Sequence, residues 1–502
     1  MLHFTKSGKY DLTSTVVPLV VVLLMILFVS ISPDLAGDSI DLVRGFLSEE
    51  LGSYYLLLGF SFVIISLYIA FSKYGKIKLG EGDPKFSTLS WAFMIFTSTM
   101  AADILFYSLH EWIYYWNVNP LDCSSLNTQE KVVWSETYSL FHWGITPWIF
   151  YILPATAYAY MMHVKKINRQ KISEACRPVL GKSVDSWQGK VIDIVSVVAL
   201  LLATSTTFSV ATPLLSSALT KVLGIDNSPL ITVGILATIV VIYTVAVVTG
   251  FKGISRVSSA CVAMFMTLIV LFLANHNFRF IVENAINSLG NLTQNFVRLS
   301  TWTDPTRSSR APQDWTIFYW AYWIAWSIAN PFFIAKISEG RTVKQLVLGG
   351  TLSGVSCTFL SFTVFGGFGI AEQVATSAGF DQMMTTGTAS EVILQIFDRL
   401  PLPRISLLIL VLAMIGFYAS TFDALTHVIA SYSYKELSVS EEPGKVSKIY
   451  WSVLFAALPC ALLFSERTSH QLQGLSIIAA FPISILMIVV VVSFFKNVRK
   501  EV

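Results

Sequence analysis

The sequence predicts an all-α protein that crosses a membrane many times. Of its 502 residues, 54% are hydrophobic and only 13% are charged, and the mean hydropathy is +0.64. Soluble domains carry about 25% charged residues, so this composition excludes an ordinary soluble enzyme or nucleic-acid-binding protein. Apolar runs long enough to span a bilayer recur along the whole chain, which predicts a polytopic membrane protein.

Twelve such runs predict twelve transmembrane helices. Several exceed the roughly 20 residues that a spanning helix needs, so we expect tilted or broken helices. The first run has no small-residue cleavage pattern after it, and we interpret it as a span rather than a signal peptide. The runs fall near residues 14–32, 54–72, 91–116, 138–163, 187–215, 231–250, 259–277, 315–338, 345–369, 403–432, 447–465 and 471–496.

The placement of basic residues predicts the orientation in the membrane. With the N-terminus inside, the cytoplasmic segments hold most of the 34 Lys and Arg residues, and the outer loops carry acidic groups such as Asp34, Asp38 and Glu49. Cytoplasmic loops of membrane proteins are enriched in Lys and Arg. We therefore expect both termini in the cytoplasm and the chain in the cell (inner or plasma) membrane.

The longest outer segment, 278–314, is predicted to contain a helix lying on the membrane surface. Its apolar residues recur at about helical spacing, which is typical of an amphipathic surface helix; they are Phe278, Ile281, Ile286, Leu289, Leu292 and Phe296. The predicted organisation is a tail with two spans (1–90), a first five-helix repeat (91–278), this extracytoplasmic segment (279–314), a second five-helix repeat (315–496) and a short cytoplasmic tail (497–502).

Four predicted spans contain clusters of small and hydroxyl residues, at 97–103, 204–213, 327–331 and 420–423. They are the first and third helices of the two predicted repeats. Interrupted helices at matching positions point to the central site of a transporter, where exposed carbonyl and hydroxyl oxygens can hold a dehydrated Na⁺. Alternatively, Ser and Thr hydroxyls bond back to a carbonyl of their own helix and only bend it.

The eighth span carries a dense aromatic cluster. At about 100° per residue, Tyr319, Tyr322, Trp323 and Trp326 share one helical face, with Trp320 flanking it and Asn330 one turn further along. Indole faces bind cations, and several rings can enclose a quaternary ammonium group that donates no hydrogen bond. An interfacial aromatic belt is the alternative, but Trp323 and Trp326 lie too deep in the span for it.

The fourth span supplies a second aromatic face. Trp148 and Tyr151 are three residues apart and deep enough to close a cage, whereas Trp143 could anchor the helix at the membrane interface. His142 is more typical of a hydrogen-bonded structural residue, so it receives no role.

Asp103 is the single residue that most strongly indicates a functional site. A carboxylate near the middle of a span costs roughly 2.5–3.5 kcal/mol to insert, so we expect one at this position to have a function. Phe106 and His110 lie on nearly the same helical face, beside Glu111. Asp103 could pair with a cationic substrate or carry a coupling proton; alternatively, it is protonated and bonded to a neighbouring hydroxyl.

These motifs together resemble the betaine/choline/carnitine transporter family (BCCT). The runs 320–326 and 335–342 are similar to the family signature YWAWWxxW…ARISRGRT. The resemblance implies twelve spans with a five-plus-five inverted repeat of the LeuT type, usually assembled as a trimer. It also implies aromatic substrate-site positions, with Tyr322 standing where the family usually has Trp; these are Phe106, Trp143, Trp148, Tyr151, Trp320, Trp323 and Trp326.

Departures from the family pattern indicate the subtype. In the third span, betaine symporters of the family carry GMGIG, whereas residues 99–103 of this chain read TMAAD, with Asp103 at the last position. The choline transporters of the family similarly carry Asp there. The Na⁺ pattern of the family is kept, which implies an ion site made by Thr97, Met100, Phe417, Ser420 and Thr421. The sodium-independent exchanger of the family has Arg and Met where this chain has Cys261 and Asn330. Ion-coupled uptake is therefore favoured, although the run 211–214 resembles the exchanger.

The predicted function is secondary active import of a quaternary ammonium compound, choline first and betaine or carnitine second. No ATP-binding motif is present, so the coupling ion is Na⁺ or H⁺ and we expect no cofactor. The expected partners are this small molecule, the lipid bilayer and further copies in a homotrimer. The alternatives are an ion-independent exchanger, a membrane-embedded enzyme, for which no HExxH or GxSxG motif appears, and a channel, for which an aromatic cage binds too tightly.

Overall fold

The computed structural model describes residues 10–98, 102–118, 121, 126–167, 169–249, 251–435, 437, 441–462 and 468–499. This part of the chain is almost entirely helical, and its only β-type pairings are two isolated bridges. The predicted all-α class is confirmed. The α-helices are α1 (Leu12–Ile31), α2 (Pro33–Gly45), α3 (Gly52–Phe71), α4 (Thr88–Ser98), α5 (Ala102–His110), α6 (Trp112–Trp116), α7 (Thr128–His142), α8 (Ile145–Ala159), α9 (Ile172–Ala175), α10 (Arg177–Leu180), α11 (Trp187–Leu223), α12 (Pro229–Thr249), α13 (Phe251–Leu273), α14 (Phe278–Thr301), α15 (Ile317–Trp326), α16 (Asn330–Ile337), α17 (Gly350–Ser361), α18 (Gly367–Thr376), α19 (Phe380–Thr386), α20 (Ala389–Asp398), α21 (Pro403–Ser431), α22 (Lys445–Leu462) and α23 (Thr468–Val498).

Membrane-spanning character is confirmed by length and composition. In the described part of the chain, 7 helices are long and apolar enough to cross a membrane, or up to 9 when two sharply bent pairs are each counted as one span. Each of the twelve predicted apolar runs overlaps helical structure. The number of twelve crossings and the inverted repeat remain predictions.

Two of the four predicted interruptions are real breaks. Helix α4 ends at Ser98 and α5 begins at Ala102, and the axis bends by 75° between α4 and the α5–α6 segment. Helix α15 ends at Trp326 and α16 starts at Asn330, where Pro331 lies in the first turn. Proline suits a helix start because its missing N–H needs no partner there. Both breaks lie at the first helix of a predicted repeat.

The other two predicted interruptions are wrong, because α11 and α21 run unbroken for 37 and 29 residues. Their hydroxyl groups bond to carbonyls of the same helix instead of freeing the backbone. In α11, the Ser205 hydroxyl donates to the Leu201 carbonyl at 2.8 Å. In α21, the Ser420 hydroxyl donates to the Phe417 carbonyl at 3.2 Å.

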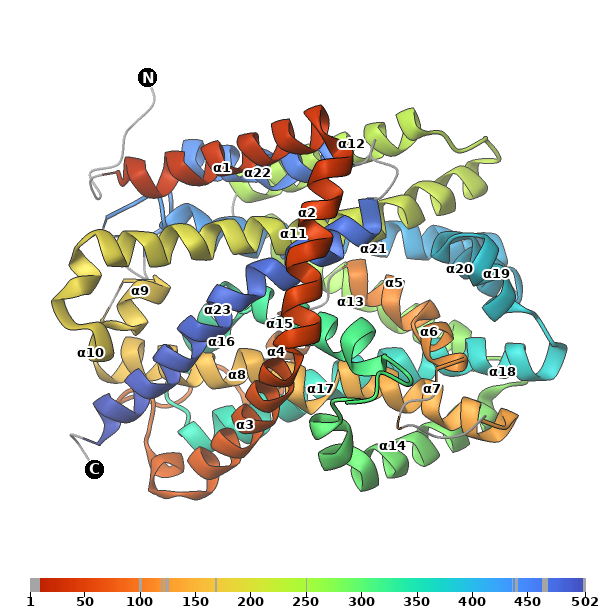
Figure 1. The fold of residues 1–502 in the computed structure, drawn as a ribbon, viewed down its shortest axis with the longest axis horizontal. Helices are drawn as coiled ribbons and strands as arrows, with labels where there is room; N and C mark the ends of the chain where they lie inside the picture. The colour runs from red at the N-terminus through yellow and green to blue at the C-terminus, as the bar shows by residue number, and fades with distance from the viewer. Residues whose placement is uncertain are drawn as a thin grey trace.

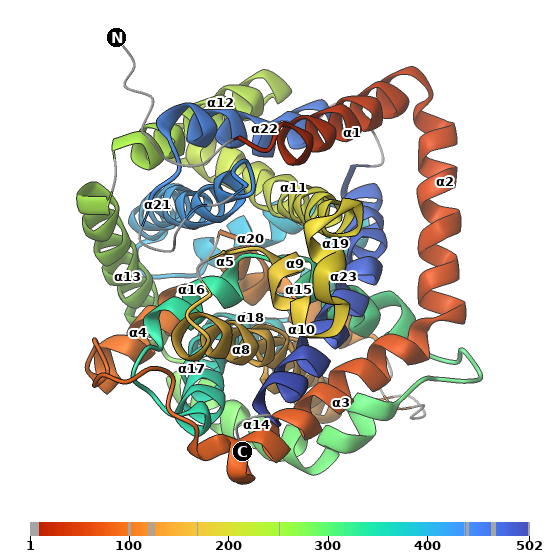
Figure 2. The ribbon, with the colours of Figure 1, turned by 90° about the vertical axis from the view of Figure 1, so that its left-hand side faces the viewer.

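The aromatic helix α15 lies in the interior of the bundle, and all its residues are buried. It packs against α23, α8, α11 and α3, and Figure 1 shows it near the centre of the molecule. Helix α1 begins and α23 ends at the same end of the molecule, next to the short helices α9 and α10 that face the viewer in Figure 2. Helices α18 to α20 lie at the opposite end.

A helix is present in the predicted extracytoplasmic segment, as α14, which turns by 106° from α13. Its place on the membrane surface remains a prediction. Its predicted apolar stripe divides into two faces. Ile281 and Leu292 are buried beside Asn284, whose side chain donates to Glu136 of α7, whereas Ile286 and Leu289 are exposed. The polar contact with α7 orients the helix, and the exposed apolar face suits contact with lipid.

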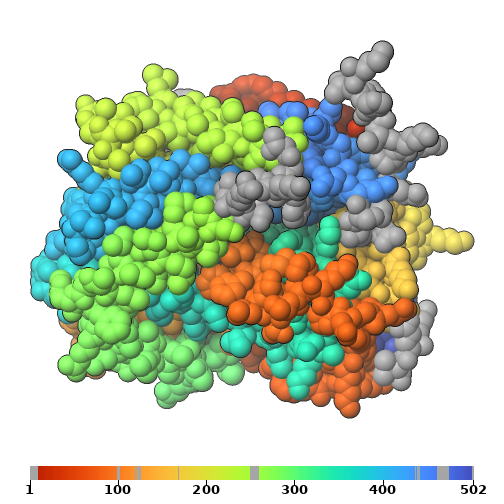
Figure 3. Space-filling view, turned by 180° about the vertical axis from the view of Figure 1, so that it is seen from behind, coloured from red at the N-terminus to blue at the C-terminus, as the bar shows by residue number. Residues whose placement is uncertain are grey.

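The face opposite to the one seen in Figure 1 is formed largely by α4, α12, α13 and α21 (Figure 3). Helices α12 and α13 expose large apolar side chains, as expected for a surface that contacts lipid rather than water; they include Leu230, Val241, Val245, Met266 and Val270.

Candidate functional site

A cavity lies where the broken helices meet α8 and α21. Small-molecule sites are usually lined by apolar and aromatic groups with a few polar ones, and this cavity has such a lining. The cavity contains most of the predicted substrate residues and one predicted ion residue; its lining is Ser98, Asp103, Ile104, Trp143, Tyr151, Tyr322, Trp323, Trp326, Asn330 and Thr421.

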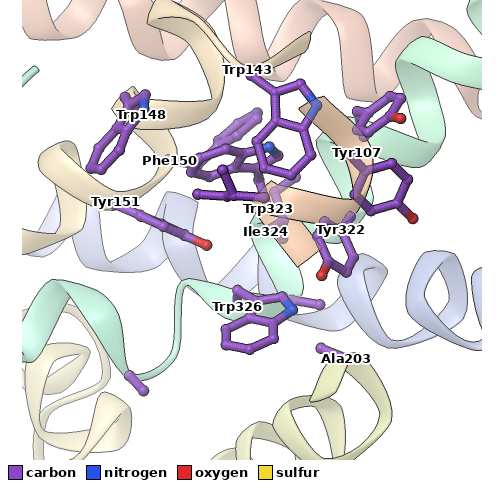
Figure 4. Close-up of a cluster of buried hydrophobic side chains, with 14 of the residues drawn as sticks. Tyr107, Trp143, Trp148, Phe150, Tyr151, Ala203, Tyr322, Trp323, Ile324 and Trp326 are labelled. Carbon is purple, nitrogen blue, oxygen red and sulfur yellow. The ribbon is translucent and has the colours of Figure 1, made fainter. Parts of the chain in front are cut away.

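Trp323 lies at the centre of the aromatic wall. Its ring centroid is 4.9 Å from that of Tyr151, 5.5 Å from that of Trp143 and 5.7 Å from that of Trp148. Figure 4 shows Trp143 and Trp148 on one side of the cluster and Trp326 on the other, with Tyr151 between them. The rings meet in tilted and edge-on arrangements, as aromatic quadrupoles prefer. The wall therefore presents several π-faces to one small volume, which suits a compact cation.

Asp103 forms the acidic corner of the cavity. Its carboxylate accepts hydrogen bonds from the hydroxyls of Tyr322 and Thr207, which are themselves 2.8 Å apart. Asp103 and Tyr322 are two departures from the family pattern, and the structure places them in contact. No Lys, Arg or His of the described residues lies among the groups that act on this carboxylate. A buried carboxylate without a cationic neighbour favours a cationic ligand.

Three predicted substrate residues lie outside the cavity lining. Trp320 faces away from it, with its ring 5.1 Å from Phe141. Phe106 packs on His110 at 4.4 Å. Trp148 lies behind Trp323, and its indole N–H donates to Thr358 at 3.4 Å. Of these three, Trp148 supports the aromatic wall from behind, through its contacts with Tyr151 and Trp323.

The predicted ion residues are only partly brought together. Thr421 lines the cavity together with Ser98, whereas the Ser420 hydroxyl is bonded to the Phe417 carbonyl. The Thr97 hydroxyl donates to the Phe93 carbonyl of its own helix at 2.9 Å. Met100 lies outside the described residues.

Comparison with known proteins shows the family of the chain. Residues 14–502 match the family described as "BCCT, betaine/carnitine/choline family transporter". The chain belongs to this family. A protein named "Carnitine transporter" from Acinetobacter baumannii is 26% identical, over 86% of this chain and 79% of the relative. "Glycine betaine transporter OpuD" from Bacillus subtilis is 29% identical, over 94% of this chain and 91% of the relative. "Uncharacterized transporter YeaV" from Escherichia coli is 28% identical, over 87% and 90%.

Membership of the BCCT family makes the chain a multi-pass membrane transporter of betaine/carnitine type, whose substrate class is small quaternary ammonium compounds. The cavity described above is the natural candidate for its substrate site. The BCCT match covers both broken helices and the whole cavity lining.

The sequence assigns no individual role to four residues of the site, of which Ser98, Ile104 and Asn330 line the cavity and Thr207 contacts Asp103. Thr207 lies inside the hydroxyl-rich run of α11, but only the packing of α11 on α5 brings it to Asp103. Ser98 and Ile104 flank the break between α4 and α5. Asn330 continues the aromatic face by one turn, and the sequence signal for its place at a helix start is Pro331 directly after it.

Gly354 is expected to be essential for the aromatic wall. A Cβ atom at this position of α17 would lie 2.1 Å from Cε3 of Trp148, far inside van der Waals contact. Gly354→Ala should therefore push Trp148 towards Trp323 and weaken substrate binding by about tenfold or more. The measurement is equilibrium binding to purified protein. Gly290→Ala on α14 is the control, because a Cβ there meets no atom within 4 Å. Equal affinities for both variants would contradict this role of Gly354.

Proposed function

We propose that the protein imports a quaternary ammonium cation, choline before betaine or carnitine, by secondary active transport. The observation that carries this proposal is the buried carboxylate of Asp103, which has no Lys, Arg or His beside it among the described residues, in a cavity walled by aromatic rings. Choline supplies a permanent positive charge and has no carboxylate of its own.

The aromatic wall and Asp103 would act together on the trimethylammonium group. A desolvated cation over one ring gains about 2 kcal/mol or more, and Tyr151, Trp323 and Trp326 all face the cavity. Asp103 adds charge attraction. For glycine betaine or carnitine, the same Asp103 would face a substrate carboxylate, and like charges brought together cost several kcal/mol.

A second candidate is ion-independent exchange of a carnitine- or betaine-like zwitterion. Two observations favour it: the named relatives include transporters of carnitine and glycine betaine, and the indole N–H groups of Trp323 and Trp326 have no acceptor among the described residues. Both donors could serve a substrate carboxylate.

The coupling ion in the proposed mechanism is Na⁺ or H⁺. Na⁺ would use oxygen atoms of Thr421, Ser420 and Phe417 with backbone of Thr97 and Met100, of which Thr421 reaches the cavity. We further propose that both termini face the cytoplasm and that the protein forms homotrimers in the cell membrane.

The test is uptake of labelled choline and glycine betaine into proteoliposomes under three conditions: an inward Na⁺ gradient, an inward H⁺ gradient, and preloaded substrate without either gradient. Choline uptake that needs an ion gradient supports the proposal and identifies the ion. Uptake only with preloaded substrate would establish the exchanger.

A further inference from the structure

A second polar cluster lies directly behind Trp143, outside the cavity. Glu111, between α5 and α6, is fully buried. One carboxylate oxygen, Oε2, accepts a hydrogen bond from the Trp143 indole N–H at 2.6 Å, and Oε1 accepts one from the Tyr115 hydroxyl at 2.8 Å. Because Trp143 lines the cavity, this carboxylate holds one wall of the substrate site from behind.

The cluster continues as a single chain of hydrogen bonds. The Tyr115 hydroxyl lies 2.7 Å from Nδ1 of His142, and Nε2 of His142 lies 2.9 Å from the Thr316 hydroxyl. Tyr115 has only one hydroxyl proton and donates it to Glu111, so Nδ1 of His142 must be the donor to Tyr115. With a neutral imidazole, Nε2 then accepts from Thr316. In this series of hydrogen bonds, from Thr316 through His142 and Tyr115, every donor points towards an ionised Glu111.

The same chain can hold one more proton without losing a hydrogen bond. A proton bound to Glu111 reverses the order: Glu111 donates to Tyr115, Tyr115 donates to Nδ1 of His142, and Nε2–H of His142 donates to Thr316. The net charge of the cluster changes from −1 to 0. The bond from Trp143 to Glu111 then loses its charge assistance, which halves its strength at most.

The surroundings offer no cation to balance the ionised form. The titratable groups that face the cluster come from α5, α6, α7 and α15, and the described residues include no Lys or Arg among them. They are Asp103, Tyr107, His110, Tyr114, Tyr138 and Tyr319. A buried carboxylate with neutral neighbours in a membrane is costly, and such residues mark proton pathways.

We propose that Glu111, Tyr115 and His142 form a proton-binding site that positions Trp143, so that a proton and a cationic substrate compete. The ionised form holds the indole firmly and adds negative charge near the cavity; the protonated form does neither. Thr316, the last residue of the π-helical turn Pro312–Thr316 (η5), ends this series of hydrogen bonds at the side away from Glu111. Only the competition with substrate rests on the proposed function.

The proton site itself is tested on substrate-free protein in lipid by infrared difference spectroscopy between about pH 5 and pH 8. The wild-type protein should show a titrating carboxyl band that is absent from Glu111→Gln. Glu136→Gln and Asp103→Asn should retain it, since Glu136 is a buried carboxylate bonded to Asn284 on the far side of α7. A wild-type protein without a titrating carboxyl band, or a band that persists in Glu111→Gln, would overturn the proposal.

The competition is tested by choline binding across the same pH range. Choline carries a permanent charge, so the substrate itself does not titrate. The wild-type affinity should fall at least about fivefold towards low pH, and choline binding should release protons to the same extent, because linkage is reciprocal. In Glu111→Gln the affinity should change less than about twofold, whereas Glu136→Gln should behave like wild type. Equal pH dependence of wild type and Glu111→Gln would contradict the competition. If choline does not bind at all, the proposed function fails while the infrared result still stands.

Discussion

Replacing Asp103 by glycine is expected to reverse the substrate preference. The change removes the only carboxylate among the described residues that line the cavity, and truncation of one partner of a desolvated charge pair costs about 2–5 kcal/mol. Choline affinity should therefore fall about 30-fold or more. Glycine betaine should gain relative to choline by at least about tenfold, because its own carboxylate is no longer repelled. Competition binding with both compounds measures this ratio.

Two further variants separate charge from structure. Asp103→Asn keeps the size of the side chain and can still accept from Tyr322 and Thr207, so it should lose choline affinity without losing thermal stability. Asp103→Gly combined with Tyr322→Trp restores the usual family pattern and should favour glycine betaine most strongly. An unchanged ratio of choline to glycine betaine affinity in all three variants would refute the role of Asp103.

Loss of Trp323 should have the largest effect of any aromatic substitution. Trp323 contacts Tyr151, Trp143 and Trp148 and lines the cavity. Trp323→Leu removes a π-face worth about 2 kcal/mol, which corresponds to roughly 30-fold weaker binding of a quaternary ammonium ion. Equilibrium binding to purified protein in detergent or lipid gives the affinity directly.

Trp320→Leu is the matched control, since it removes an indole three residues away on the same helix. Trp320 is buried against Phe141 and Phe150 outside the cavity. Its loss should lower the unfolding temperature through the void it leaves, while affinity stays within about threefold of wild type. Similar losses of affinity in Trp320→Leu and Trp323→Leu would show that the cavity does not distinguish the two faces of α15.

Local chemistry explains which parts of the fold could be predicted. The break before α16 was predictable because Pro331 follows a run of small residues and disfavours a continuous helix. The hydroxyl run of α11 gave the same signal but no break, since Ser205 bonds back to Leu201. Sequence alone cannot decide whether such a hydroxyl serves its own helix or a ligand.

The candidate site, too, could be predicted from the sequence only in part. Helical periodicity placed Tyr322, Trp323 and Trp326 on one face, and all three line the cavity. Trp320, included through the family resemblance, lies elsewhere because it sits at the flank of that face. The contact between Asp103 and Tyr322 joins residues 219 positions apart. Only the packing of α5 against α15 and α11 reveals it.

The central claim is that the cavity binds a quaternary ammonium ion through its charge. The most direct test is displacement of labelled choline from wild-type protein by unlabelled choline and by 3,3-dimethylbutan-1-ol, which has the same shape with carbon in place of the charged nitrogen. We predict that choline displaces the label and that the uncharged analogue binds at least about 100-fold more weakly, because it forfeits both the cation–π attraction and the pairing with Asp103. Comparable displacement by both compounds would show a merely apolar pocket and contradict this account.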